Sequence, residues 1–308
     1  MTQRPRVGAA ALLLALAALA CTPAHATQYC DADAANRLSA GQKDRLFRLA
    51  AIVKAELDDS GAPLALIARS GLDLSRVQQR YSHAGISLRA GPETPWSVRQ
   101  LYFACDAGRP LLFDQGMAAF VLGTDAPEIG YVSVVLLPPE AAEALQAAAL
   151  DKSLALRLLG ANYSANAFAF AADYQNCNQW VVELLAAAAG GVASNDGSES
   201  ARVAAQRWLQ REGYAPTVFD LRSRPWLWWA VPFVPWLHRD DHPADDLQQL
   251  RFRVSMPQSI DAFVQHRWPA AQRIEFCHDD RRVVIHRGWQ ALADGCVPGA
   301  QDTVVALD

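Results

Sequence analysis

Two hydrophobic periods alternate along the chain, and together they predict a mixture of helices and strands. Leu46, Leu49, Val53 and Leu57 recur at the spacing of one helical face, after a capping-box pattern that begins at Ser39. Shorter segments have the β-branched composition or the period of two that is typical of strands, namely residues 64–68, 82–88, 96–103, 130–137 and 251–255. The pattern favours an α+β fold with an antiparallel sheet and helices packed on it.

One predicted strand, residues 82–88, carries a histidine. Its alternation separates a core face from a face that is directed toward a cleft: Ala84, Ile86 and Leu88 on the first, and His83, Gly85 and Ser87 on the second. The next strand is expected to pair with it through a short hairpin. Gln100 on that strand is our first choice for a polar group that orients the imidazole, because Arg99 faces the opposite way and Asp114 falls in the following loop. A solvent-facing glutamine without such a role is the alternative.

A later segment carries a cysteine at the predicted start of a helix. Asn176 is a suitable N-cap, Cys177 takes the first helical position, and residues 181–185 are apolar. A free thiol has a pKa of roughly 8.5, which the N-terminus of a helix and a neighbouring imidazolium lower. The segment therefore predicts an activated nucleophile with His83 as its partner. The alternative is a buried, inert cysteine that begins a core helix.

The first 26 residues have the pattern of an export signal. Two arginines precede the apolar run 7–20, and residues 24–26 fit a small-x-small cleavage site. We therefore expect a periplasmic or secreted protein. A lipoprotein signal that acylates Cys21 is the alternative.

Export makes the number of cysteines informative. Without the signal the chain keeps Cys30, Cys105, Cys177, Cys277 and Cys296, an odd number in an oxidising compartment. Sequence separation favours Cys277 with Cys296 and Cys30 with Cys105. Cys177 is then left as a free thiol, which agrees with its place at a helix start.

The composition sets broad limits on size and partners. The 308 residues are 51% hydrophobic and 19% charged, enough for a sizeable core. A net charge of -4 and scattered arginines give no electrostatic surface for nucleic acid. A Gly-rich connection near residue 190 divides the mature chain into a core, residues 27–190, and a C-terminal α/β extension, residues 191–308.

The C-terminal extension holds three features with open interpretations. The Trp-rich segment 225–237 is too short and too proline-broken to span a bilayer, and packing or a lid over the cleft is favoured over a peripheral membrane contact. The acidic and histidine residues of 238–246 lack zinc spacing, so we expect a solvated loop, no metal and no cofactor. A hairpin over residues 273–286 extends the same sheet or forms an accessory lobe.

Two motifs carry a resemblance to known families. Ser-His-Ala-Gly-Ile at residues 82–86 and Tyr-Gln-Asn-Cys-Asn-Gln-Trp at residues 174–180 resemble the circularly permuted NlpC-type branch of the papain-like hydrolases, in which histidine precedes cysteine. With Asp-Asp-His-Pro at residues 240–243, the mature chain is also similar to the bacterial DUF2145 family.

The resemblance to the hydrolases implies a papain-like fold with Cys177 as nucleophile and His83 as general base and acid. The third position in those enzymes is commonly His, Glu or Asn, and Gln100 departs from this. Aromatic and amide residues in or directly before these motifs are assigned to substrate binding, namely Tyr81, Tyr174, Asn176 and Trp180. The implied activity is that of a thiol amidase, peptidase or acyltransferase on a peptidoglycan peptide or acyl substrate. A non-catalytic envelope binding protein with the same fold is the alternative.

Overall fold

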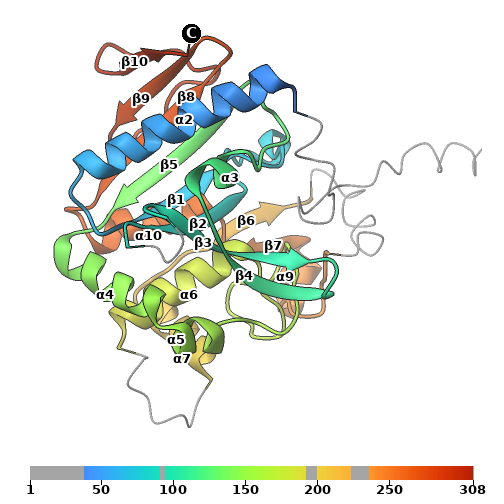
Figure 1. The fold of residues 1–308 in the computed structure, drawn as a ribbon. Helices are drawn as coiled ribbons and strands as arrows, with labels where there is room; N and C mark the ends of the chain where they lie inside the picture. The colour runs from blue at the N-terminus through green and yellow to red at the C-terminus, as the bar shows by residue number, and fades with distance from the viewer. Residues whose placement is uncertain (1–37, 91–93, 192–199, 223–235, 308) are drawn as a thin grey trace, which may run out of the picture.

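A computed structural model describes residues 38–90, 94–191, 200–222 and 236–307 of the chain. The fold is α+β and is built on one large antiparallel sheet (Figure 1). Among the described residues this sheet has eight strands in the order β10-β9-β8-β5-β1-β2-β3-β4. Its strands are β1 Leu64–Arg69, β2 His83–Leu88, β3 Ser97–Ala104, β4 Arg109–Gln115, β5 Gly130–Leu136, β8 Gln272–His278, β9 Arg282–Arg287 and β10 Thr303–Ala306. A separate two-stranded sheet pairs β6 Thr217–Asp220 with β7 Arg251–Val254.

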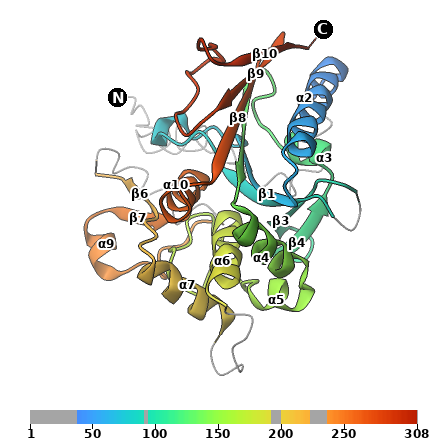
Figure 2. The same cartoon turned by 90° about the vertical axis from the view of Figure 1, so that its left-hand side faces the viewer.

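Helices cover both faces of the main sheet (Figure 2). The longer helices of the described chain are α2 Ala40–Asp59, α4 Pro139–Leu150, α6 Cys177–Ala189, α7 Ala201–Arg211 and α10 Pro257–Arg267. Short helical segments are α3 Met117–Val121, α5 Lys152–Arg157, α9 Ala244–Gln248 and the 3-10 turn η2 Ser75–Val77. α2 and α3 pack on one face, and α4, α6 and α10 pack on the other.

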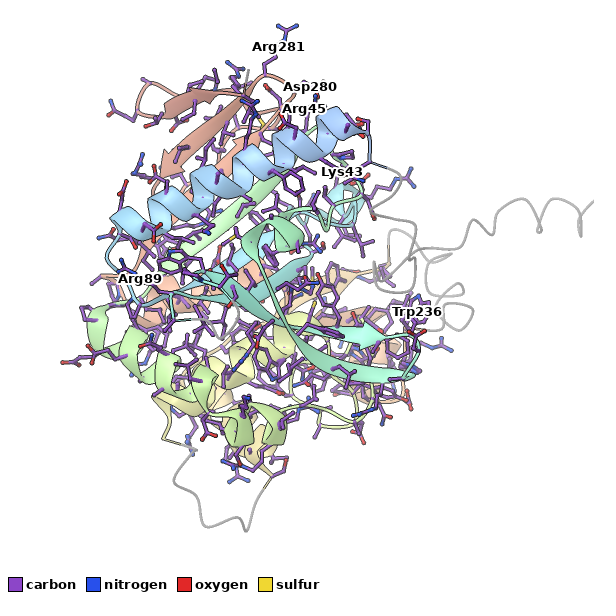
Figure 3. All side chains as sticks on the ribbon, viewed as in Figure 1. Lys43, Arg45, Arg89, Trp236, Asp280 and Arg281 are labelled. Atoms are coloured by element: carbon purple, nitrogen blue, oxygen red, sulfur yellow. A yellow bond between two sulfur atoms is a disulfide. The ribbon has the colours of Figure 1, made fainter. Side chains whose placement is uncertain are left out.

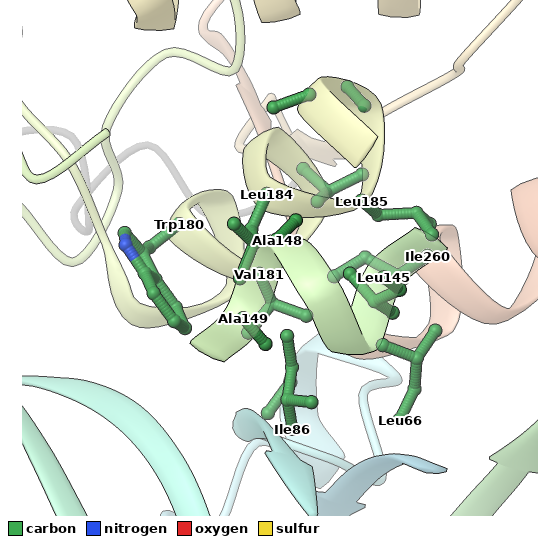
Figure 4. Close-up of a cluster of buried hydrophobic side chains, with 14 of the residues drawn as sticks. Leu66, Ile86, Leu145, Ala148, Ala149, Trp180, Val181, Leu184, Leu185 and Ile260 are labelled. Atoms are coloured by element: carbon green, nitrogen blue, oxygen red, sulfur yellow. The ribbon is translucent and has the colours of Figure 1, made fainter. Parts of the chain in front are cut away.

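The two helical layers explain why the central strands lack an exposed side. All six residues of β1 and all six of β2 are buried. Figure 4 shows Leu66 of β1 and Ile86 of β2 meeting Val181 of α6 and Leu145 of α4. The period of two in β2 therefore separates two cores rather than a core from solvent. Ala84, Ile86 and Leu88 pack toward α6, as the pattern predicted.

Several predicted elements are confirmed, with one clear difference. The capping box at Ser39 and Gln42 is present, and Leu46, Leu49, Val53 and Leu57 form the buried face of α2. Residues 112–128 were expected to form a loop or a short helix; the short helix is present as α3, but Asp114 and the residues before it belong to β4, the edge strand. Pro110 and the partly exposed polar side chains of β4 obscure its pattern, and pairing with β3 along its full length makes it a strand.

The last three strands of the C-terminal extension join the main sheet. β8 pairs with β5 along seven residues, and β9 and β10 continue the sheet outward. Arg45 of α2 forms an ion pair at 2.9 Å with Asp280 in the turn between β8 and β9 (Figure 3). This pair joins the first described helix to the C-terminal hairpin. The hairpin over residues 273–286 thus extends the sheet and does not form a separate lobe. No helix in the described ranges has the length and apolar character needed to cross a bilayer.

The predicted pairing of Cys277 with Cys296 is confirmed, with their Cα atoms 5.3 Å apart. It fixes the loop after β9 to β8. Cys105 is also disulfide-bonded, but Cys30 lies outside the described residues, so the pairing between these two stays a prediction. The same holds for the export signal and for residues 225–235 of the Trp-rich segment.

Replacing both Cys277 and Cys296 with alanine is expected to lower the free energy of unfolding by about 3 kcal/mol, because the unfolded chain gains the entropy of a loop of this size. Urea unfolding of the double variant measures the change. Both cysteine side chains are fully buried, so their truncation to alanine can only lower the stability further. An unchanged urea midpoint would therefore show that the disulfide contributes nothing to stability.

Candidate active site

The thiol of Cys177 lies at the N-terminus of α6, where the sequence predicts it. Asn176 caps this helix and its side chain accepts a hydrogen bond from the Gln179 amide at 2.7 Å. The cap leaves the amides of Cys177 and Asn178 directed at the sulfur. Cys177 is the free cysteine among the described residues. Such a helix terminus stabilises negative charge on the sulfur or on a bound oxygen.

A local separation of β2 from β3 gives the thiol one more donor. β2 pairs with β3 only from Ile86 to Leu88, although β3 continues to Ala104. Arg89 donates its amide to Pro63 on the β1 side, so by alternation the amide of Ala84 is directed to the β3 side. Because β3 is no longer paired there, the Ala84 amide acts on the sulfur of Cys177 instead. The thiol therefore occupies the place where the sheet begins to open.

His83 lies next to this opening and is held by a chain of two glutamines. Its Nε2 is 2.8 Å from Oε1 of Gln100, so the expected hydrogen bond is present. Gln100 donates from its own amide nitrogen to Gln115 at 2.6 Å, which leaves its oxygen to accept a proton from the imidazole. This network fixes the Nε2-protonated tautomer and leaves Nδ1 as the basic nitrogen.

Two further residues that the sequence did not indicate complete the surroundings of His83. Tyr102 stacks on the imidazole, with ring centroids 4.3 Å apart and planes 15° from parallel. Arg69 is the register partner of His83 on β1 and donates to the Tyr102 hydroxyl at 3.0 Å. The hairpin pattern contained a signal for Tyr102, because it stands two residues after Gln100 and shares its face. The signal for Arg69 required the pairing of β1 with β2, which sequence alone does not give.

Burial decides the charge state of both candidate catalytic groups. It raises the pKa of Cys177 to about 11, although the Asn178 amide, Arg69 and the Ala84 amide each lower it. Burial and the nearby Arg69 charge lower the pKa of His83 to about 3, and the hydrogen bond to Gln100 only partly offsets this. At neutral pH the resting pair is therefore an uncharged thiol and an uncharged imidazole. The sequence interpretation expected a thiolate beside an imidazolium, but it did not include desolvation.

The thiol and the imidazole are not joined directly. No hydrogen bond connects the Cys177 sulfur with the imidazole among the residues that the structure describes. Cys177 packs with the core of the α6 face, whereas the His83 ring is near Phe120 of α3, 6.1 Å between centroids, on the other face. Tyr102 links the two sides: it stacks on His83, and its pKa is raised by burial and, less strongly, by the charge of Cys177. Ala84, whose amide acts on the sulfur, is the chain neighbour of His83, so the backbone of β2 separates the two groups.

A cluster of aromatic rings includes Tyr163, which lies within electrostatic range of the thiol. Burial and, less strongly, the charge of Cys177 raise the pKa of the Tyr163 hydroxyl. Its ring lies 5.7 Å from that of Phe103, and Phe103 lies 5.5 Å from Trp236 (Figure 3). Only 7% of Cys177 is exposed. The sulfur therefore has little exposure to a substrate carbonyl in this structure.

The residues assigned to substrate binding do not gather around the thiol. Trp180 is fully buried and its indole donates to the Ala155 carbonyl at 3.3 Å. Asn176 is used as the helix cap. We therefore leave both out of the proposed substrate surface.

The two tyrosines of that set are also engaged elsewhere. Tyr81 is buried and its hydroxyl donates to Glu275 in a separate cluster of charges. Tyr174 lies at the surface, where it donates to Asp240 at 3.0 Å and stacks on His238. Neither contacts the thiol.

The acidic and histidine segment after the Trp-rich run differs from the expected solvated loop. His242 is buried and its Nε2 is 2.8 Å from the Asn166 carbonyl oxygen, while Asp241 accepts the Phe168 amide at 2.7 Å. These contacts hold the segment that leads to Cys177. Within the described chain no three side chains of the metal-binding types come together.

The His83 pKa predicts how stability changes with pH. The unfolded histidine takes up a proton below about pH 6.5 and the folded one only near pH 3, so stability is lost as the pH falls below 6.5. At pH 5 this loss is about 2 kcal/mol relative to pH 7. In His83→Gln the change in unfolding free energy between these two pH values should shrink by that amount, as measured in urea. The variant and the native chain both keep His278, whose pKa burial lowers to about 4, so its contribution cancels.

A family model matches residues 56–264, which is more than half of the chain and includes Cys177, His83 and Gln100. The chain belongs to the DUF2145 family, described as uncharacterized protein conserved in bacteria. The match to DUF2145 crosses the expected domain boundary at residue 190 and ends before β8. Neither the curated proteins nor the solved structures contain a significant match to the chain.

Proposed function

We propose that this DUF2145 protein is an exported thiol hydrolase or acyltransferase that acts on an amide or ester through Cys177 and His83. The observation that carries the proposal is the local arrangement of the two: a lone thiol sits at a capped helix N-terminus beside the start of a strand whose histidine is oriented by Gln100. A structural cysteine needs neither an oriented imidazole nor three amides around its sulfur. The NlpC-type resemblance supplies the same roles for the same residues.

The reaction follows from the neutral resting pair. As the sulfur attacks a carbonyl carbon, the thiol proton passes to Nδ1 of His83 through one water, because no hydrogen bond in the described part of the chain joins the two groups at rest. The carbonyl oxygen becomes an oxyanion that the Cys177 amide stabilises. Collapse of this intermediate breaks the bond to the leaving amine or alcohol, which takes the proton from the imidazolium. Water or an acceptor alcohol or amine then attacks the thioester and gives its proton to His83. Collapse of the second tetrahedral intermediate breaks the carbon–sulfur bond, and the imidazolium returns the proton to the sulfur of Cys177.

The predicted export signal and the disulfide support a substrate outside the cytoplasm. The disulfide between Cys277 and Cys296 suits an oxidising compartment. Peptidoglycan peptides are the amide substrates that an exported bacterial protein meets in greatest quantity, so we propose a cell-wall peptide, with an acyl ester as the other substrate class.

The proposal predicts that Cys177 forms a covalent acyl intermediate. Incubation with p-nitrophenyl acetate should release p-nitrophenolate in a burst and leave one acetyl group on the peptide that contains Cys177, as measured by mass spectrometry. Cys177→Ser should show neither the burst nor the acetyl group at that position. Equal acetylation of native and denatured protein would contradict an activated nucleophile.

A non-catalytic envelope binding protein is the second candidate, and one observation favours it. The thiol and the imidazole are both buried, and burial holds their pKa values at about 11 and about 3. An uncharged thiol and an uncharged imidazole are also expected in the core of a protein without catalytic activity. The binding protein would bind peptidoglycan fragments equally well before and after Cys177→Ser, and would show no burst.

A further inference from the structure

A cavity of about 640 Å³ lies away from the thiol, between the β1–β2 connection, β8 and α10. Its lining includes neither Cys177 nor His83. The volume is in the range that encloses small organic ligands. The thiol chemistry proposed above makes no use of it, so what it binds is a separate question.

Glu275 forms the floor of this cavity. Its side chain is fully buried and accepts hydrogen bonds from Arg80 at 2.8 Å, from Arg273 at 3.2 Å, from the Leu292 amide at 2.8 Å and from the Tyr81 hydroxyl. Although burial raises its pKa, these donors together with the charge of Arg273 bring the pKa below its usual value. Glu275 is thus a fixed negative charge at the base.

The two guanidinium groups of the lining are already engaged. Arg80 bridges Glu275 and Asp294, at 2.8 and 2.6 Å, and lies 4.3 Å above the Tyr131 ring. Arg273 donates to Ser133, Asp261 and Glu275 at 3.1 to 3.3 Å. Neither presents the open fork of donors that binds a carboxylate or phosphate ligand. An anionic ligand is therefore disfavoured.

Acceptors and negative charge are in excess on the same walls. The lining has four carboxylates, those of Asp73, Asp261, Glu275 and Asp294, against the guanidinium groups of Arg80 and Arg273. Two more acceptors, Oε1 of Gln79 and Oε1 of Gln258, are buried from solvent and have no hydrogen-bond partner. Unpaired buried acceptors cost free energy unless a ligand supplies the donor.

The remaining walls are apolar. Leu72, Leu74 and Ile129 line one part of the cavity, and Trp289 and Tyr131 line another. Ile129 is 42% exposed and stands at the rim. A fitting ligand therefore combines an aliphatic body with a positive group that carries several N–H donors.

We propose that this cavity binds a primary alkylammonium group, carried either by a free diamine or by a lysine-like side chain of a peptide. We assign the ammonium to Asp261 as its charged partner, with the unpartnered Oε1 atoms of Gln258 and Gln79 on the same lining as further acceptors for its three donors. Its alkyl chain packs along the leucine and tryptophan walls. The inference does not depend on thiol chemistry and is tested without it.

Asp261 gives the binding its pH dependence. Burial raises its pKa to about 6, with Glu275 adding to the rise, while Arg273 and Ser133 oppose it. The charged and titratable groups that face it are Arg273 and Glu275 from β8 and Tyr81 ahead of β2. Because a cation prefers the ionised carboxylate, affinity for an amine should fall as the pH is lowered from 7 to 5.

Calorimetric titration of the full-length Cys177→Ala protein tests the proposal. Cadaverine and Nα-acetyl-lysine amide serve as the probes for the two sources of the ammonium group, and glutarate serves as the anionic counterpart of cadaverine. We expect saturable binding of at least one amine and none of glutarate. Binding of cadaverine alone identifies a free amine as the source, and binding of the capped lysine identifies a peptide. Saturable binding of neither amine, or of glutarate as well, overturns the proposal.

Three variants assign the binding to this cavity. Asp261→Asn should weaken amine binding about tenfold or more, since it removes the ionised partner and keeps the shape. Gln258→Glu should strengthen it about fivefold by adding a charge at an unpaired acceptor, a gain that a damaged fold does not produce. Asp44→Asn on α2, whose exposed pair with Arg48 lies on the far face of the sheet, should change nothing. Equal affinities in all three variants would place the ligand elsewhere and overturn the assignment.

Discussion

Replacing His83 with alanine is expected to slow acylation of Cys177 by about 10² to 10⁴-fold, which is the usual contribution of a general base. The thiol of the resting protein is uncharged because burial raises its pKa to about 11, so attack requires a base at the moment of reaction. Without the imidazole only the small thiolate fraction can attack. Stopped-flow release of p-nitrophenolate from p-nitrophenyl acetate measures the rate.

Two controls separate this loss from a change in folding. Added imidazole should restore part of the His83→Ala rate, because it can occupy the cavity that the substitution leaves and accept the proton. His266→Ala, an exposed histidine on α10, should leave the rate unchanged. An acylation rate for His83→Ala equal to that of the native protein would exclude His83 as the base.

Replacing Arg202 with methionine is expected to lower the free energy of unfolding by about 3–5 kcal/mol, because it leaves the carboxylate of Glu183 buried without a counter-charge. The side chain of Glu183 on α6 is fully buried, and Arg202 on α7 donates to it at 2.9 Å. Arg202 also donates to the Ala172 and Tyr174 carbonyls, at 2.6 and 2.9 Å, so the same side chain positions the segment before Cys177. Urea unfolding at pH 7 measures the loss.

A second substitution tests whether the unpaired charge is the cause. Glu183→Gln combined with Arg202→Met removes both charges and keeps an amide that Gln175 and Gln206 can still contact. Most of the lost stability should return in this double variant. Asp44→Asn, which breaks an exposed ion pair, should cost less than about 0.5 kcal/mol. If the double variant is as unstable as Arg202→Met alone, the loss comes from packing and not from charge.

At the thiol site, local sequence signals predicted the positions of the side chains but not their charge states. Asn176, Cys177 and the apolar run behind them locate a helix start, because capping and periodicity depend on residues a few positions apart. The expectation that Gln100 lies beside His83 rested on a short hairpin, which is also a local feature. The charge state of the pair was predicted wrongly, because desolvation depends on burial in a core that is assembled from segments far apart in the chain.

The amino-acid sequence by itself determined the α2 and α6 helices, the histidine strand and its neighbour, the unpaired thiol, and one disulfide. All of these follow from the spacing of apolar residues, from caps or from cysteine parity. Only the tertiary structure decided that β8 to β10 join the main sheet, that Arg69 stands opposite His83, and that Glu275 forms the floor of a separate cavity. These facts depend on strand order and burial, which are set when segments far apart in the chain compete to cover the same hydrophobic surface.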